Sequence, residues 1–139
     1  MKKTLPILLF LVLFSLKITG QTTPQELSKT FTNSLLNYNE EKLKVLLSTD
    51  SVEQKNILEK LKKISSTDLK PLKGSKTLSS STRAVLKDGD KIYKERADIF
   101  ITITDNKEYK YELKLWGCGK INDKWFVGNK IELEKVAVF

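Results

Sequence analysis

Histidine is absent from this chain of 139 residues, and cysteine occurs only once. Without histidine the chain cannot carry Ser-His-Asp or Cys-His catalysis, and the usual zinc sites are excluded as well. A single cysteine cannot form an internal disulfide. A secreted form of this protein would therefore depend on its apolar core, which a chain of this length is able to build.

Other chemistries lack their motifs too. No glycine-rich stretch has the spacing of a phosphate-binding loop. The acidic segments at residues 88–90 and 105–106 are predicted to be turns, because "DGDKIYKERADI" lacks the further ligands and the closing glutamate of a calcium loop. We therefore expect no metal ion and no cofactor.

The amino-terminal segment "MKKTLPILLFLVLFSLKITG" has the three parts of a secretory signal peptide. Two lysines precede a short apolar run at residues 5–16, which ends at Lys17, and Gly20 is a suitable residue before a cleavage site. The run is shorter than the roughly 18 to 20 apolar residues of a membrane-spanning helix. The pattern predicts a signal peptide at residues 1–20 and one domain at residues 21–139, periplasmic or secreted and without a stable membrane span after cleavage. An uncleaved signal anchor is the alternative.

The charge is mixed rather than strongly basic. Cleavage would remove Lys2, Lys3 and Lys17 and no acid, so that the net charge falls from +8 to +5. In the remaining chain lysines alternate with acids, and only Arg83 and Arg96 offer a guanidinium group for bidentate phosphate contacts. Such a surface favours no nucleic-acid partner.

Helical patterns fill the first half of the expected domain. Thr23 before Pro24 is a typical helix start, and Asn39 is a second capping residue. A third start is expected at residues 49–51. Apolar residues follow these starts at helical spacing and predict three amphipathic helices. They are Leu27, Phe31, Leu35 and Tyr38, then Leu43, Leu46 and Leu47, and finally Ile57, Leu58, Leu61 and Ile64.

Strand patterns fill the second half. The segment "SSTDLKPLKGSKTLSSST" is expected to be a connecting loop, with a short strand near Leu78 at most. "RAVLK", "ADIFITIT", "EYKYELKLWGCG", "KWFVG" and "KIELEKVAVF" follow, separated by turns of two to four residues. Alternation in the second and third runs predicts a sheet with one buried and one solvated face. The fold class is therefore α+β, with amino-terminal helices packed on a curved antiparallel sheet of four to five strands.

The segment "WGCGKINDKWFVG" is predicted to be a hairpin with a two-residue turn at Asn122 and Asp123. Strict alternation from this turn places one group of residues on the face opposite Leu113 and Leu115. That group is Trp116, Cys118, Trp125 and Val127. Gly117 and Gly119 either leave room for a neighbouring ring, expected to be Phe126, or mark a bulge. The group is either covered by the carboxy-terminal "VAVF" or exposed as an interaction patch.

Two stretches resemble the nuclear transport factor 2-like, or cystatin-like, superfamily. "FTNSLLNYNEEKLKVLLSTDS" is similar to its long helix, polar break and second helix, and "GKINDKWFVGNKIEL" is similar to its closing hairpin. The resemblance implies a curved cone-shaped sheet wrapped on a long helix, a pocket at the wide end, and dimerisation through the open sheet face. Its isomerase-like members use an acidic base with a tyrosine, but no residue set here matches theirs one by one.

The candidate site residues are few. Asp98 is the acid nearest to apolar residues, and it is either a catalytic base with a raised pKa or the partner of a neighbouring Lys or Arg. Cys118 is either a reactive thiol or a small buried residue. The aromatic candidates for binding, against which a core or rim position must be weighed, are Phe100, Tyr109, Tyr111, Trp116 and Trp125, with Tyr93 as a further hydroxyl.

Two function classes follow from these residues. The first is an exported non-catalytic domain that binds a small apolar ligand, a peptide or an envelope protein, and that is a possible homodimer. The second is a small isomerase-like enzyme that uses Asp98 and a tyrosine. The absence of histidine and of paired carboxylates favours the first class.

Overall fold

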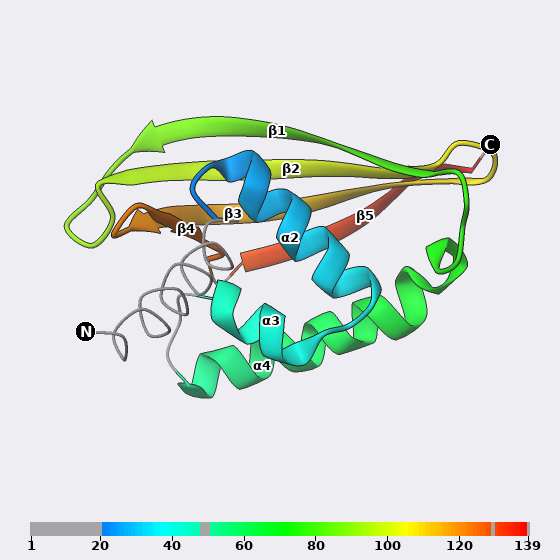
Figure 1. Cartoon of the computed structure of the whole chain (residues 1–139), viewed down its shortest axis with the longest axis horizontal. Coiled ribbons are helices and arrows are strands. Elements are labelled where there is room, and N and C mark those ends of the chain that lie inside the picture. Colours follow the sequence, from blue (N-terminus) through cyan, green and yellow to red (C-terminus); the bar gives the residue numbers. More distant parts are fainter. Residues whose placement is uncertain (1–20, 48–50, 129, 139) are drawn as a thin grey trace, which may run out of the picture.

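The computed structural model describes residues 21–47, 51–128 and 130–138. Within them the protein is an α+β fold, with three helices followed by a five-stranded antiparallel sheet (Figure 1). The helices are α2 (Pro24–Leu36), α3 (Glu40–Leu46) and α4 (Ser51–Lys63). The strands are β1 (Leu78–Asp88), β2 (Glu95–Asp105), β3 (Tyr109–Ile121), β4 (Lys124–Phe126) and β5 (Lys130–Val138). None of the described helices is long and apolar enough to cross a membrane.

The helix starts follow from their capping residues. The Thr23 hydroxyl accepts a hydrogen bond from the Glu26 N–H at 3.1 Å, and the Asn39 side chain accepts one from the Lys42 N–H at 3.2 Å. Both predicted caps are confirmed. The third predicted start, at residues 49–51, lies largely outside the described residues, and α4 begins at Ser51. After α4 the chain continues through a π-helical turn (Ile64–Asp68) and a 3₁₀ turn (Lys70–Leu72).

The sheet is a meander whose last two strands share one edge. β1, β2 and β3 lie side by side, and β3 pairs along its other edge with β4 near one end and with β5 along most of its length. β1 pairs with β2 from Leu78 opposite Asp105 to Asp88 opposite Glu95. The prediction of a loop through the serine cluster is therefore wrong at residues 79–82. Serines tolerate an edge strand when the neighbouring strand supplies the backbone hydrogen bonds.

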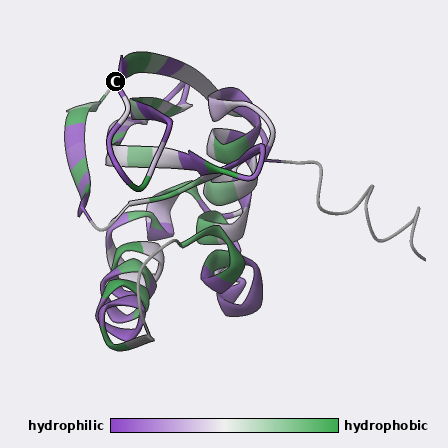
Figure 2. Cartoon of the chain, turned by 90° about the vertical axis from the view of Figure 1, so that its left-hand side faces the viewer, coloured by the Kyte–Doolittle hydropathy of each residue, from purple (hydrophilic) through white to green (hydrophobic). Residues whose placement is uncertain are grey.

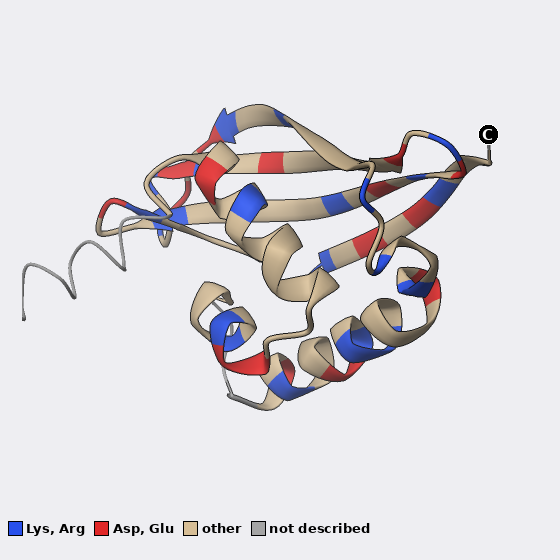
Figure 3. Ribbon diagram, turned by 45° about the vertical axis from the view of Figure 1, so that its right-hand side comes forward, with Lys and Arg blue, Asp and Glu red and all other residues tan. Residues whose placement is uncertain are grey.

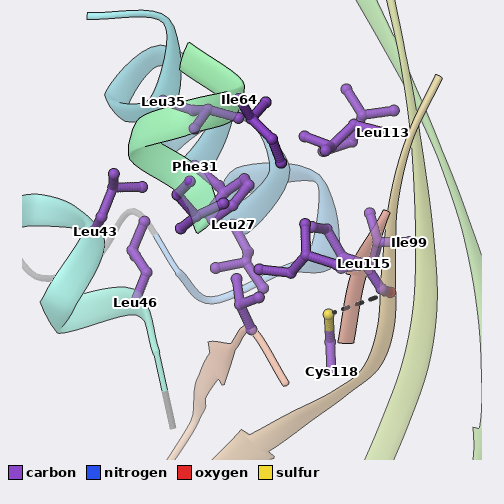
Figure 4. Packing of buried hydrophobic residues seen from close by; sticks show 14 of the residues in the cluster. Leu27, Phe31, Leu35, Leu43, Leu46, Ile64, Ile99, Leu113, Leu115 and Cys118 are labelled. Atoms are coloured by element: carbon purple, nitrogen blue, oxygen red, sulfur yellow. Dashed lines mark hydrogen bonds between the residues drawn. The ribbon is translucent and has the colours of Figure 1, made fainter. Parts of the chain in front are cut away.

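The helices all lie on one side of the sheet, and the core is between the two layers (Figure 2). The predicted apolar stripes of α2, α3 and α4 are buried there, against the inner sheet positions (Figure 4). Those inner positions are Ile99, Ile101, Ile103, Tyr111, Leu113 and Leu115. Burial of each large aliphatic side chain stabilises the fold by about 1.5–3 kcal/mol before the cost of chain ordering is subtracted. Among the described residues, the buried apolar cluster extends from Leu27 to Ile131.

A bulge in β3 changes which residues share a face. Ala97 lies opposite Cys118 and Ile99 lies opposite Leu115, so that Trp116 and Gly117 both oppose Asp98. Gly117 has a φ of 64°, which glycine adopts readily. The extra residue leaves Leu115 and Cys118 both buried, with Trp116 on the other face.

The hairpin turn itself is as predicted. Asn122 and Asp123 have φ values of 49° and 65°, and the register places Lys120 opposite Trp125 and Gly119 opposite Phe126. The predicted grouping of Trp116 with Cys118, Trp125 and Val127 is wrong, because strict alternation does not pass through the bulge. The three other members are buried, and Val127 forms an isolated bridge with Leu47.

The free edge of β4 is covered by the start of the fold and by α3. Trp125 N–H donates to the Gln21 carbonyl oxygen at 2.7 Å, and the Gln21 side-chain Nε2 donates to the Trp125 carbonyl oxygen at 3.0 Å. Val127 N–H donates to the Leu46 carbonyl oxygen at 2.8 Å. The part of the "VAVF" tail that the structure describes, residues 136–138, does not cover Trp125, since Val138 pairs with Tyr109 at the far end of β3. Phe139 lies outside the described residues.

Candidate functional site

An aromatic pair lies on the face of the sheet that the described helices leave uncovered. Phe100 of β2 and Trp116 of β3 are both half-buried, and their ring centroids are 5.4 Å apart with an interplanar angle of 89°. This edge-to-face arrangement is favourable beyond the buried area itself. The neighbouring positions on the same face of β3 carry Lys110, Glu112 and Lys114, so the pair is an apolar island in a polar surface.

A cation lies at each end of this pair. The Arg83 guanidinium carbon is 4.5 Å from the centroid of Phe100, and the Lys130 ammonium is 5.7 Å from the centroid of Trp116. The pairing register explains both contacts, since Arg83 lies opposite Phe100 and Lys130 lies opposite Trp116. These four residues, from β1, β2, β3 and β5, form a line across the sheet that we call the aromatic–cation row.

The charges around the row are largely paired. Lys114 contacts Glu134 at 3.2 Å, and Lys130 contacts Glu132 at 3.6 Å. Figure 3 shows both signs interspersed over the strands and helices. The row is therefore distinguished by its two half-buried rings and by Arg83, whose guanidinium group lies over the Phe100 ring.

Asp98 lies beside the row, and its contacts favour the ion-pair interpretation. Its side chain is 7 % exposed, forms an ion pair with Lys87, and accepts a hydrogen bond from the Gly117 N–H at 2.9 Å. Burial by itself would raise the pKa of Asp98, but the contacts with Lys87 and Gly117 and the charge of Arg96 outweigh it and lower the pKa. The catalytic-base interpretation required the opposite shift.

No tyrosine hydroxyl among the described residues bonds to Asp98. Tyr93 lies in the loop between β1 and β2, where the Arg96 guanidinium carbon is 5.6 Å from its ring centroid. The Tyr93 ring lies against Gly119, at which an added Cβ would approach it to 2.3 Å. The space that Gly119 provides is therefore taken by Tyr93, and the expectation that Phe126 would fill it is wrong.

Tyr109 and Tyr111 lie at the opposite end of β3, away from Asp98. Their ring centroids are 6.3 Å apart. Tyr111 is 4 % exposed, and burial, followed by the charges of Tyr109 and Asp68, raises the pKa of its hydroxyl. A hollow of about 340 Å³ lies there, between the turns after α4 and the sheet. It is lined by Thr67, Asp68, Pro71, Tyr111, Leu133 and Lys135.

Cys118 and Trp125 belong to the core. Burial raises the pKa of the Cys118 thiol to about 12, and the thiol donates to the Leu115 carbonyl oxygen (Figure 4). The thiolate is the nucleophilic form of cysteine, so this side chain is unreactive at neutral pH. Trp125 is 3 % exposed, so it lies in the core and not at the surface.

Of the predicted aromatic binding residues, the structure brings Phe100 and Trp116 together and places the others elsewhere. Sequence reasoning missed Arg83 and Lys130, which only the strand register could have identified as neighbours of the rings. Within the described part of the chain, no three acidic or cysteine side chains gather as a metal site.

No family model, no curated protein and no solved structure matches this chain.

Proposed function

We propose that the protein is an exported binding domain without a catalytic role, and that the aromatic–cation row holds an acidic segment of an envelope protein or peptide. The observation that carries this proposal is the half-exposed Phe100–Trp116 pair with Arg83 and Lys130 at its ends. A solvated sheet face has no structural need for two adjacent large rings.

The chemistry of the row suits a protein surface. Aromatic rings supply a large contact area and have few rotatable bonds, and Trp and Arg are enriched among residues that dominate binding energy. The planar guanidinium group of Arg83 can bind a carboxylate through two hydrogen bonds. Among the described residues no acid forms an ion pair with Arg83, so the group can accept an acidic partner. An acidic partner segment would therefore lie across β1, β2 and β3.

Two further parts of the proposal rest on the sequence. The leader pattern at residues 1–20 supports export to the periplasm or the outside of the cell. We also infer that the fold is a variant of the nuclear transport factor 2-like cone. The supporting features are a long helix followed by a short one, a meander sheet, and a closing hairpin with a tryptophan.

A small apolar ligand is the second candidate, favoured by the hollow beside Tyr111. Its volume of about 340 Å³ is at the lower end of ligand-site sizes, and Leu133 and Pro71 give it an apolar wall. The isomerase-like alternative has less support, because Lys87 keeps the Asp98 carboxylate charged and engaged. A second copy of the chain on the open sheet face is the remaining occupant of the row.

Photo-crosslinking tests this proposal. A photoreactive residue at Val85, which is exposed on β1 beside the row, should give an adduct in the native envelope. The same residue at Val52, exposed on α4, is the matched control and should give none. The adduct should disappear when Phe100 and Trp116 are both changed to Ala. An adduct of twice the chain mass would identify a second copy, and equal labelling at both positions would contradict the proposal.

A further inference from the structure

Gln21 is built into the fold through its main chain and its side chain. Its side chain is 5 % exposed, and it makes two hydrogen bonds with the main chain of Trp125. The Gln21 carbonyl oxygen accepts from the Trp125 N–H at 2.7 Å, and the side-chain Nε2 donates to the Trp125 carbonyl oxygen at 3.0 Å. A surface glutamine at the end of a domain does not need such contacts.

We propose that Gln21 is the first residue of the mature chain, and that its docking on Trp125 protects its side-chain amide from cyclisation to pyroglutamate. This inference rests on the export proposal, which places signal cleavage between Gly20 and Gln21. With cleavage at that bond, the residue that docks on Trp125 and the new amino terminus are the same residue.

The reaction that the docking opposes is an intramolecular acyl transfer. The free α-amino nitrogen of Gln21 attacks its own side-chain amide carbon, Cδ, and a nitrogen–carbon bond closes a five-membered lactam. The Cδ–Nε2 bond breaks, a proton passes from the amine to the leaving nitrogen, and ammonia departs. No oxidant, reductant or second substrate is needed, and the chain loses the mass of one ammonia molecule.

The docked geometry works against this reaction through the leaving group. Nε2 is the atom that must depart, and in the folded chain it donates to the Trp125 carbonyl oxygen. Because Trp125 is 3 % exposed, loss of Nε2 leaves that oxygen without its donor in surroundings that water does not readily enter. Ring closure therefore requires the docked contact to open first, and its rate in the folded chain falls with the population of the opened form.

The closing experiment measures ammonia loss. Residues 21–139, which contain every core residue that the structure describes, are released from a fusion by a protease that cuts directly before Gln21. The intact mass is then followed in native buffer and in urea. A peptide of residues 21–28 in both buffers gives the intrinsic rates. We expect loss of ammonia in native buffer to be at least about tenfold slower than in the peptide, which corresponds to about 1.4 kcal/mol. Equal normalised rates in the native and unfolded chain would overturn the proposed protection.

A charge-matched pair of variants tests the side-chain contact separately. Gln21→Glu replaces the donor by an acceptor facing the Trp125 carbonyl, and it should lower the urea midpoint of unfolding. Gln25→Glu makes the same change at an exposed position of α2 and should not. Equal midpoints would show that the amide contact is absent. Sequencing the amino terminus of the exported protein tests the cleavage site alone, so failure of the export proposal is seen independently.

Discussion

The two faces of one sheet differ sharply in this protein. Every inward position of β2 from Ala97 to Ile103 carries an apolar side chain that is completely buried. The outward positions between them carry Asp98, Phe100 and Thr102. Phe100 and Thr102 are half-buried, and Asp98 is buried in an ion pair with Lys87. The inner face is occupied by three helices, whereas the described residues place nothing over the outer face (Figure 2).

The two tryptophans make this difference concrete. Trp125 is enclosed, and its main chain is hydrogen-bonded to Gln21. Trp116 is half-buried, and its ring contacts Phe100 and Lys130. The same residue type is therefore enclosed in the core on one face and partly open to solvent on the other. Four predictions test how far the two faces differ.

The largest effect is expected at the inner tryptophan. Trp125→Ala removes a nearly fully buried ring and should cost about 3–5 kcal/mol of unfolding free energy. Trp116→Ala should cost only about 1–2 kcal/mol, from the ring contact and partial burial. Urea denaturation followed by circular dichroism measures both. A cost for Trp116→Ala as large as that for Trp125→Ala would remove the distinction between the faces.

The second effect concerns binding rather than stability. Once the crosslinked partner segment is identified, Trp116→Ala should weaken its binding by about 2 kcal/mol or more, as for a residue that dominates an interface. The control is Val136→Ala, an exposed apolar change on β5 outside the row, which should leave the dissociation constant unaltered. Calorimetric titration measures both, and equal weakening by the two variants would argue against the row as the binding site.

The third effect is expected at the bulge that separates the faces. Gly117→Ala places a Cβ 2.7 Å from Nη2 of Arg96 at a φ of 64°, and should destabilise the fold by about 1–2 kcal/mol. Gly74 has a φ of 79° with no atom within 4 Å of an added Cβ, so Gly74→Ala isolates the backbone cost. If both variants lower the melting temperature equally, the Arg96 side chain moves aside without a measurable loss of stability.

The smallest effect is a change in the pH dependence of stability. The contacts of Asp98 hold its pKa in the folded state below the unfolded value of about 3.9. Its ionisation therefore contributes stability that is present above about pH 4 and is lost as the pH falls through the folded-state pKa. Asp98→Asn should flatten the stability profile in that acid range. Asp123→Asn, in the exposed hairpin turn, serves as the control, and a similar flattening there would contradict the assignment.

Local patterns were sufficient to predict much of the fold. Capping by Thr23 and Asn39, the apolar stripes of the helices, the buried isoleucines of β2 and the turn at Asn122 and Asp123 each depend on residues close together in the chain. The full length of β1 was missed, since its serines are held by pairing with β2, which composition does not reveal.

The candidate site was predicted less well, because it depends on contacts between distant residues. Phe100 and Trp116 were predicted as aromatic candidates, but their contact follows from the register of β2 against β3. The contacts of Arg83 and Lys130 follow from the pairing of β1 with β2 and of β5 with β3. The bulge at Gly117 was one of two open interpretations of the glycines. The other interpretation, strict alternation through the glycines, placed Trp116 and Cys118 on the same face, whereas the bulge places them on opposite faces.

The bulge also has a meaning in genetic terms. β3 consists of two half-strands with opposite alternation, joined by the single extra residue Gly117. Loss of that one codon would bring Trp116 and Cys118 together in regular alternation and leave both on the faces that they occupy now. Loss of the codon for Leu115 or Lys120 would instead turn the neighbouring side chains inside out. Gly117 is thus a position of β3 at which the length of the strand can change without exchanging the outer face for the core.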